Sequence, residues 1–291
     1  MKILVTGAYG MLGRDFCSLL KANGFSIWEW DLPEHDITNI NKTIEEILEL
    51  KPDVVCHLAA YTNVDNAEKE PGRAFMVNVQ GTWAIADACL QLDIPLLYIS
   101  TDYVFDGTKN TPYEENDPPN PINYYGKTKY LGEEVIKSHL KKYFIVRTSW
   151  LFGTHGRNFV TTIIELARKN KEITVVNDQI GSPTYTYDLS EALLKVITSK
   201  YYGTYHITNS GFCSWYEFAL EIKKLTGFTS SIIPITSDKL KRLAIRPLYS
   251  VLNNKKYRKR FGEVLRPWQK GLKAFLEGVG YEGDKISKTS R

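Results

Sequence analysis

Short apolar runs alternate with amphipathic stretches along the first half of the chain. Most of the runs are continuously apolar, which is typical of strands covered on both faces, and the stretches between them repeat at helical spacing. Strand and helix in this alternation predict an α/β fold, a Rossmann-type doubly wound parallel sheet with helices on both faces. The pattern predicts strands over residues 3–5, 26–30, 53–58, 95–100 and 144–147, and helices over residues 10–22, 38–50, 74–92 and 125–140.

The alternation loosens after about Trp150, where Pro-rich and aromatic loops appear. Capping boxes at residues 188–191 (Asp-x-x-Glu) and 214–217 (Ser-x-x-Glu) predict two helix starts in this half. We therefore expect one domain over residues 1–150 and a smaller C-terminal domain over residues 151–291. The smaller domain is expected to be partly interleaved, with some segments returning to the sheet of the first.

Composition places the chain among ordinary globular proteins. Hydrophobic residues make up 43% and charged residues 24%, so a sizeable core is available. The 37 basic and 33 acidic residues leave a charge of +4, which is slight for 291 residues and argues against a nucleic-acid partner. No run approaches the roughly 18 to 20 apolar residues of a membrane span, and the first residues do not match a signal sequence. We expect no membrane contact.

The four cysteines are Cys17, Cys56, Cys89 and Cys213, which lie far apart. They form no CxxC pair and match no Cys/His metal spacing, a pattern typical of reduced, buried thiols. We therefore expect a cytoplasmic protein with neither a disulfide framework nor a zinc site.

A glycine-rich segment joins the first predicted strand to the first helix. It runs Thr6-Gly7-Ala8-Tyr9-Gly10-Met11-Leu12-Gly13, with the spacing GxxGxxG rather than the commoner GxGxxG. Such glycines permit a tight turn, the approach of a pyrophosphate and close packing of helix on strand. The N–H groups at the helix start then attract phosphate. We interpret Gly7, Gly10, Met11, Leu12 and Gly13 as dinucleotide-binding residues, and a purely structural turn is the alternative.

An acidic residue, Asp31, stands about 20 residues further on, where the second strand ends. There a carboxylate can accept hydrogen bonds from both hydroxyls of the adenine ribose and repel a 2′-phosphate, which favours NADH over NADPH. Arg14 opposes this preference, since a nearby guanidinium can accommodate the phosphate. Asp36 and Ile37 are candidates to flank the adenine. A capping role is the alternative for both aspartates.

A Tyr-x-x-x-Lys pair begins the fourth predicted helix. Its spacing puts Tyr125 and Lys129 on one helical face. A phenol with a pKa near 10 is a poor acid at neutral pH unless its phenolate is stabilised, which a nearby ammonium does. Thr101 follows the fourth strand at the carboxyl edge of the sheet, where such sheets place their ligands, and its hydroxyl can donate to a substrate carbonyl. The alternative for Tyr125 and Lys129 is a pair on the protein surface, and the alternative for Thr101 is an ordinary turn residue.

Together these residues resemble the extended short-chain dehydrogenase/reductase superfamily and, more narrowly, the dTDP-4-dehydrorhamnose reductases. The resemblance runs from Met1 to about Trp268. It rests on the glycine turn and on five further segments, at residues 59–65 (AAYTNVD), 100–107 (STDYVFDG), 125–129 (YGKTK), 147–150 (RTSW) and 177–184 (NDQIGSPT).

The resemblance implies an NAD(P)H-dependent reduction of the 4-keto group of dTDP-4-dehydro-6-deoxy-L-mannose to dTDP-L-rhamnose. It makes Tyr125 the proton donor, Lys129 its partner and Thr101 the hydroxyl that orients the carbonyl. It implies that the first domain binds the cofactor and the second mainly the substrate.

The resemblance also assigns two groups of binding residues. Those expected to line the cofactor after the third strand are Ala59, Ala60, Tyr61 and Thr62, although many relatives carry histidine at the position of Tyr61. Those expected to contact the nucleotide sugar, besides Thr101, are Asp102, Trp150, Val64, Asp65 and Asn158.

Several properties stay open at this point. Relatives are known to use Mg²⁺ at a dimer contact, but the sequence identifies no ligands for it, so no metal site is assigned; a homodimer is one option. Asn78 can serve either a proton relay or a helix-to-loop bond. The alternatives to the main prediction are a 4-keto reductase for another nucleotide deoxysugar and a non-catalytic nucleotide-binding subunit resembling the methionine adenosyltransferase β subunit.

Overall fold

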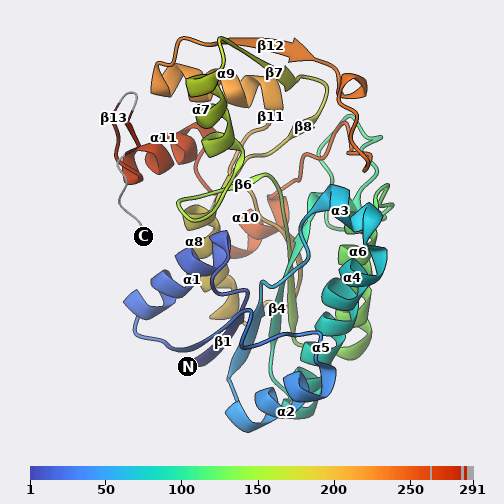
Figure 1. The fold of residues 1–291 in the computed structure, drawn as a ribbon. Coiled ribbons are helices and arrows are strands. Elements are labelled where there is room, and N and C mark those ends of the chain that lie inside the picture. Colours follow the sequence, from blue (N-terminus) through green and yellow to red (C-terminus); the bar gives the residue numbers. More distant parts are fainter. Residues whose placement is uncertain (263, 283–284, 287–291) are drawn as a thin grey trace.

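A parallel sheet of six strands forms the centre of the computed structural model, which describes residues 1–262, 264–282 and 285–286. The strand order is β10-β5-β4-β3-β1-β2, and helices cover both faces (Figure 1), which confirms the predicted fold class. The strands are β1 (Lys2–Thr6), β2 (Ser26–Trp30), β3 (Val54–His57), β4 (Leu96–Thr101), β5 (Tyr143–Thr148) and β10 (Gly203–His206).

Alternate residues of strands β1 to β5 enter two separate hydrophobic clusters. Ile3 and Val5 of β1 belong to a cluster with α1, α8 and α10, whereas Leu4 belongs to one with α2, α5 and α6 on the opposite face. Strands buried on both faces account for the continuous apolar runs in the sequence. The helices are α1 (Met11–Ala22), α2 (Ile40–Leu50), α4 (Pro71–Phe75), α5 (Thr82–Leu92), α6 (Tyr124–His139), α8 (Thr186–Ile197) and α10 (Lys255–Phe261).

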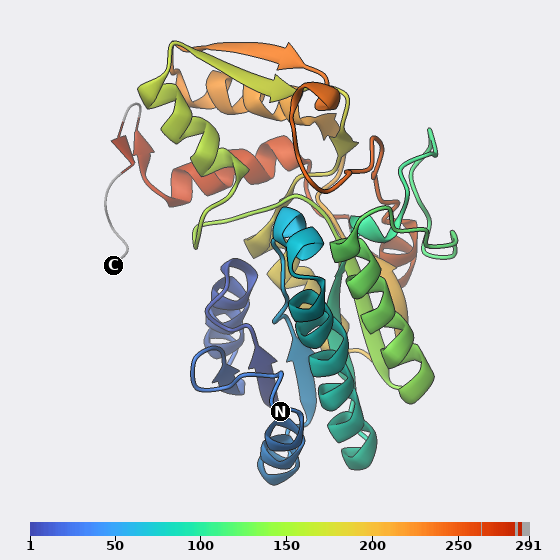
Figure 2. The same cartoon turned by 45° about the vertical axis from the view of Figure 1, so that its right-hand side comes forward.

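A second lobe lies on the side of the sheet where the strands end (Figure 2). It has its own hydrophobic cluster and a parallel pair of strands, β7 and β12. Its main elements are α7 (Phe159–Lys169), β7 (Glu172–Val176), α9 (Trp215–Thr226), β12 (Ser231–Ile235) and α11 (Trp268–Gly278). Three elements from the second half of the chain belong to the first lobe instead. Strand β10 pairs with β5, and helices α8 and α10 pack on one face of the sheet. The domain boundary between residues 150 and 151 stays a prediction, and part of the range 151–291 falls outside the described residues.

The helix predicted over residues 74–92 is interrupted. Between α4 and α5 the chain forms a π-helical turn over Met76–Gly81. This wider turn buries Asn78, whose Nδ2 donates to the carbonyl of Tyr61 (3.1 Å) and to the hydroxyl of Thr128 on α6 (3.0 Å). Asn78 therefore makes a helix-to-loop bond. Hydrophobic periodicity carries no signal for such a local widening.

Of the two predicted capping boxes, one is confirmed. Ser214 caps α9: its Oγ accepts from the N–H of Glu217 (3.1 Å), and the Glu217 carboxylate accepts from the N–H of Ser214 (2.7 Å). The prediction at Asp188 is wrong, because α8 begins at Thr186 without a side-chain cap. The Asp188 carboxylate accepts instead from the guanidinium of Arg266 (2.6 Å), a partner that no local pattern reveals.

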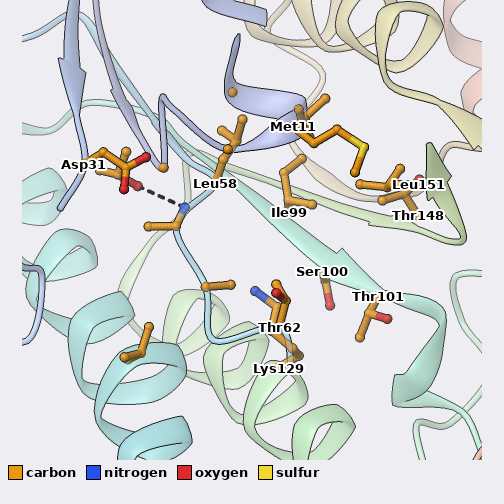
Figure 3. A pocket seen from close by; sticks show the side chains of 18 of the residues that line it. Met11, Asp31, Leu58, Thr62, Ile99, Ser100, Thr101, Lys129, Thr148 and Leu151 are labelled. Carbon is orange, nitrogen blue, oxygen red and sulfur yellow. Dashed lines mark hydrogen bonds between the residues drawn. The ribbon is translucent and has the colours of Figure 1, made fainter. Parts of the chain in front are cut away.

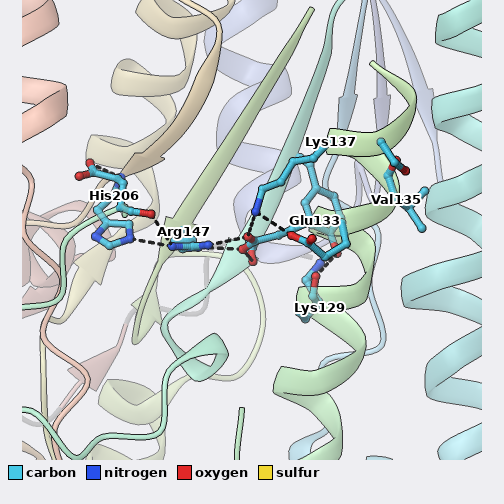
Figure 4. A network of polar contacts seen from close by, with 11 residues as sticks. Lys129, Glu133, Val135, Lys137, Arg147 and His206 are labelled. Atoms are coloured by element: carbon cyan, nitrogen blue, oxygen red, sulfur yellow. Dashed lines mark hydrogen bonds and ion pairs between the residues drawn. The ribbon is translucent and has the colours of Figure 1, made fainter. Parts of the chain in front are cut away.

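A buried ion pair joins α6 to the sheet (Figure 4). Arg147 on β5 donates to both carboxylate oxygens of Glu133 on α6, at 2.8 and 2.6 Å, and both side chains are at most 1% exposed. Ser100 on β4 donates to the same carboxylate (2.6 Å). Burial alone would raise the pKa of Glu133, but the hydrogen bonds and charge of Arg147 lower it below its usual value. This network ties α6, β4 and β5 together.

Replacing Arg147 should therefore be costly. Arg147→Leu removes the bidentate, fully buried cation of Glu133 and leaves only the partly exposed Lys137 (3.3 Å), so we expect the free energy of unfolding to fall by about 3–5 kcal/mol in urea denaturation. Lys142→Met is the matched control, since it breaks the exposed pair of Lys142 with Asp93 (2.7 Å) and should cost less than about 1 kcal/mol. Equal losses in the two variants would contradict a structural role for the buried pair.

Candidate active site

A cavity of about 600 Å³ opens at the carboxyl edge of the sheet (Figure 3). It lies where the strand order reverses, since β1 is flanked by β2 on one side and β3 on the other. Open α/β sheets bind their ligands at such a point. The residues of its wall that the sequence singled out are Gly7, Gly10, Met11, Leu12, Gly13, Asp31, Asp36, Ile37, Ala59, Ala60, Thr62, Thr101, Asp102, Tyr125, Lys129 and Trp150.

In the glycine turn, backbone segments pack too closely to leave space for side chains at Gly7 and Gly13. Gly7 has a left-handed backbone (φ +70°), and a Cβ there would lie 2.6 Å from the nitrogen of Ala59 in the loop after β3. A Cβ on Gly13 would lie 2.1 Å from the carbonyl oxygen of Gly7. Helix α1 begins at Met11 with no side-chain cap and no acidic residue in its first turn, so its end can attract an anion.

Asp31 lines the cavity at the end of β2, apart from Lys129 (Figure 3). Its carboxylate accepts from the N–H of Tyr9 in the glycine turn and from the N–H of Leu32, both at 2.8 Å. These bonds hold the carboxylate at the end of β2. Arg14 donates from Nε to the carbonyl of Tyr9 (3.0 Å) and does not belong to the wall.

Tyr125 and Lys129 reach the cavity from the first turns of α6. Asn123 caps this helix through a hydrogen bond from the N–H of Gly126 (2.8 Å). A Cβ on Gly126 would lie 2.1 Å from the carbonyl of Tyr103, so the helix packs closely against the segment after β4. Burial raises the pKa of the Tyr125 phenol above its usual value, and a hydrogen bond with Thr101 works against that rise.

Thr101 is linked to a buried carboxyl group. Its hydroxyl donates to Oδ1 of Asp102 (3.0 Å), and Ser250 donates to Oδ2 (2.5 Å). Burial raises the pKa of Asp102 to about 7, while the bonds from Ser250 and Thr101 lower it. The chain of contacts Ser250–Asp102–Thr101 thus ends beside Tyr125.

Trp150 bounds the cavity on the side of the second lobe. Its backbone is left-handed (φ 49°), which is a strained conformation for a residue with a bulky side chain. Its ring stacks on Trp215, with centroids 3.5 Å apart and planes within 6°. A Cβ on Gly181 would lie 2.4 Å from the Trp150 ring, so glycine is required there. The ring is thus held by packing from two segments.

Four predicted residues lie outside the wall of the cavity: Tyr61, Val64, Asp65 and Asn158. Asp65 binds the guanidinium of Arg246 (2.7 Å), whose hydrogen bonds hold the pKa of that carboxyl below its usual value. Asn158 caps α7. Tyr61 lies on the loop after β3, and Val64 begins α3 (Val64–Lys69). The binding roles of these four residues stay predictions.

Sequence reasoning missed part of the wall, including Trp30, His35, Ile99, Thr148 and Leu151. Thr148 ends β5 directly opposite Thr101 in the register, and its buried hydroxyl has no partner among the described residues. Its position at a strand end was the available signal. Ser250 reaches Asp102 from a loop that is distant in the sequence, and no sequence signal indicates this contact.

Within the described ranges, no group of three or more His, Cys, Asp or Glu side chains could hold a metal ion. No helix in that part of the chain has the length and apolar character needed to cross a membrane. The four cysteines are buried and free.

The chain is similar to known proteins over nearly its whole length. A family model described as the RmlD substrate binding domain matches residues 1–280. A dTDP-4-dehydrorhamnose reductase from Aggregatibacter actinomycetemcomitans is 40% identical, over 94% of this chain and 97% of the relative. The crystal structure of one from Clostridium acetobutylicum has a TM-score of 0.94 and 43% identity, over 96% of this chain and 100% of that chain. The structure of one from Bacillus anthracis, in complex with NADP, has a TM-score of 0.93 and 41% identity, over 95% and 99%.

The close approach at Gly7 gives a test of the dinucleotide turn. Gly7→Ala adds a Cβ against Ala59 at a left-handed position, so we expect it to cost more than about 3 kcal/mol of stability and to weaken NADH binding at least tenfold. Urea denaturation and NADH fluorescence measure the two effects.

Gly24→Ala is the matched control for that substitution. Gly24 is also left-handed (φ +76°), but its Cβ would meet nothing within 4 Å, so only about 1–2 kcal/mol of backbone strain is expected. NADH binding that survives in Gly7→Ala as well as in Gly24→Ala would rule out a cofactor at this turn.

Proposed function

The chain belongs to the family of the RmlD substrate binding domain, and from this we propose how it acts: it is an oxidoreductase that reduces dTDP-4-dehydrorhamnose to dTDP-L-rhamnose with a nicotinamide cofactor. Thr101, Tyr125 and Lys129 are its catalytic residues. One observation carries this assignment: these three side chains share a single cavity with the glycine turn.

The cavity fits a dinucleotide. Gly7 and Gly13 let the turn pack tightly against Ala59 and against its own backbone, which brings the start of α1 to the cavity wall, where its free N–H groups suit a pyrophosphate. Asp31 suits the hydroxyls of the adenine ribose, and Lys129, in another part of the wall, suits those of the nicotinamide ribose. Five further residues are assigned to the cofactor because they line the same wall: Asp36, Ile37, Ala59, Ala60 and Thr62.

The side chains of this site can handle the proton of the reaction. A bound, reduced nicotinamide supplies the hydride. Tyr125 donates its proton to the 4-keto oxygen, and the Lys129 ammonium stabilises the phenolate that remains. Thr101 has a single hydroxyl proton, which turns from Asp102 to the same oxygen when substrate binds and stabilises the developing charge there, an effect worth roughly 10²–10³ in rate per donor.

The sugar nucleotide is assigned to the side of the cavity that the second lobe bounds. Asp102 and Trp150 line it there. Val64, Asp65 and Asn158 lie further out, and their contact with substrate would require the outer part of the nucleotide to extend beyond this cavity.

Three finer properties are part of the proposal. We infer a preference for NADH over NADPH, supported by the fixed carboxylate of Asp31 and by the bond of Arg14 to the carbonyl of Tyr9, which leaves Arg14 out of the cavity wall. We infer a reducing, cytoplasmic setting, supported by four buried, unpaired thiols. A homodimer stays a prediction.

A product-identified assay tests the activity. Enzymatically generated dTDP-4-dehydrorhamnose should oxidise NADH and yield dTDP-L-rhamnose, because the predicted donor and orienting hydroxyl face one cavity. We expect Tyr125→Phe to lower kcat by at least about 10²–10³ and to leave NADH affinity within about twofold, since the lost proton serves only the chemical step.

Tyr124→Phe is the matched control, because Tyr124 precedes Tyr125 on α6 but does not line the cavity. Wild-type turnover in Tyr125→Phe would remove this phenol from the mechanism. Turnover of a dTDP-4-keto sugar of the other configuration, and not of the rhamnose precursor, would favour a reductase of another deoxysugar. Stoichiometric binding to another enzyme, with no turnover of any dTDP-4-keto sugar, would favour a non-catalytic nucleotide-binding subunit.

The cofactor preference has its own test. Asp31→Asn keeps the shape of the side chain and removes its charge, so we expect the ratio of kcat/KM for NADPH to that for NADH to rise about tenfold, which corresponds to about 1.4 kcal/mol. Glu34→Gln removes a nearby exposed charge that is not part of the wall and controls for the general field. An unchanged ratio in Asp31→Asn would show that another residue selects the cofactor.

A further inference from the structure

Lys129 is a buried cation without an acidic partner. It is 2% exposed, and its ammonium forms neither a hydrogen bond nor an ion pair with any described residue. The carboxylate one turn further along α6, that of Glu133, is taken up by Arg147, Ser100 and Lys137. Burial of an unpaired ammonium is unfavourable, so something else must stabilise it.

An aromatic face fills this role. The Nζ atom of Lys129 lies 4.0 Å from the centre of the Tyr98 ring. Tyr98 belongs to β4 and is completely buried, so no water competes for the ring. A cation over a ring face is attracted by the negative charge of the π system, most strongly where both are desolvated.

The fold holds this ring in place. A Cβ on Gly132 of α6 would lie 2.5 Å from the Tyr98 hydroxyl, so the glycine leaves the space in which that hydroxyl sits. On its other side the ring contacts His57 of β3, with ring centroids 5.5 Å apart. Tyr98 therefore cannot move away from Lys129 without disturbing both β3 and α6.

The remaining groups around Lys129 do not replace the ring. Burial, together with the charge of Lys129, lowers the pKa of His57 to about 3, so His57 is neutral at working pH. Burial lowers the pKa of Lys129 itself to about 7, and the charge of Glu133 opposes this only in part. Tyr125, on the same helix, is a neutral phenol until it has given up its proton.

We propose that Tyr98 is a positioning residue of the reductase, whose ring face keeps the Lys129 ammonium charged and directed into the cavity. The inference rests on the proposed function, in which that ammonium stabilises the Tyr125 phenolate. Tyr98 itself lies beneath Lys129 and belongs to no part of the cavity wall. It acts on the chemistry only through Lys129.

The test weakens the ring face in steps. Position 98 is first replaced by phenylalanine, which also removes the hydrogen bond from the Tyr98 hydroxyl to the carbonyl of Lys129 (3.4 Å) and therefore serves as the reference. It is then replaced by phenylalanines that carry one, two and three ring fluorines, which withdraw charge from the ring. The pKa of Lys129 is followed by NMR in the full chain labelled at lysine Cε, with Lys129→Met assigning the signal. We expect that pKa to fall stepwise with each fluorine, by about one unit or more over the series.

A second measurement connects the ring to turnover. The alkaline limb of the kcat profile should move to lower pH in the same order, because a neutral Lys129 no longer stabilises the phenolate. The same fluorinated residue at Phe16, a buried ring on α1 away from the site, is the matched control and should leave the signal of Lys129 in place.

The outcomes separate the two proposals. If the unsubstituted protein turns over its substrate and the pKa of Lys129 stays the same in all the variants at position 98, the role of Tyr98 is overturned. A stepwise fall in that pKa supports it even where no dTDP-sugar is turned over, in which case the proposed function fails instead. A shift caused equally by fluorination at Phe16 counts against the ring face.

Discussion

The four-residue spacing along α6 connects the chemistry of this protein to its core. Tyr125, Lys129 and Glu133 follow one another on the face of the helix that packs against the sheet. The first two line the cavity, and the third forms the buried pair with Arg147. Because that pair is bidentate and dry, α6 cannot rotate or slide without leaving a charge unpaired. The proposed proton donor and its cation are thereby held by an ion pair that lies outside the cavity wall.

The elements and motifs that the sequence revealed are those encoded locally. Strand β2 and helix α1, the glycine turn and the Tyr125/Lys129 pair each depend on neighbours within a few residues. What sequence reasoning missed depends on partners far away in the chain. Asp102 and Ser250 are 148 residues apart, and Asp188 and Arg266 are 78 apart, so no window of sequence shows that these groups meet. The same applies to Tyr98 and Lys129, whose contact requires the packing of α6 on β4.

This difference also explains why the two sides of the cavity were not equally predictable. The cofactor side is built by one continuous stretch, from the glycine turn to α6, so its motifs keep a fixed order. The substrate side is assembled where the second lobe meets the sheet. Trp150 is held there by Trp215 and Gly181, and Asp102 by Ser250. If the proposed substrate side is right, the choice of sugar depends on how the two lobes are assembled and not on one segment alone.

The sixth strand has a consequence for how the molecule is made. When only the residues up to Trp150 have emerged from a ribosome, β5 is an open edge and the face that α8 will cover is bare. An unpaired strand beside an uncovered apolar face is prone to association with other chains. The sheet is completed only after His206 of β10 has been synthesised. Residues 1–150 therefore contain an incomplete sheet, whose last edge is covered only when the later part of the chain has been made.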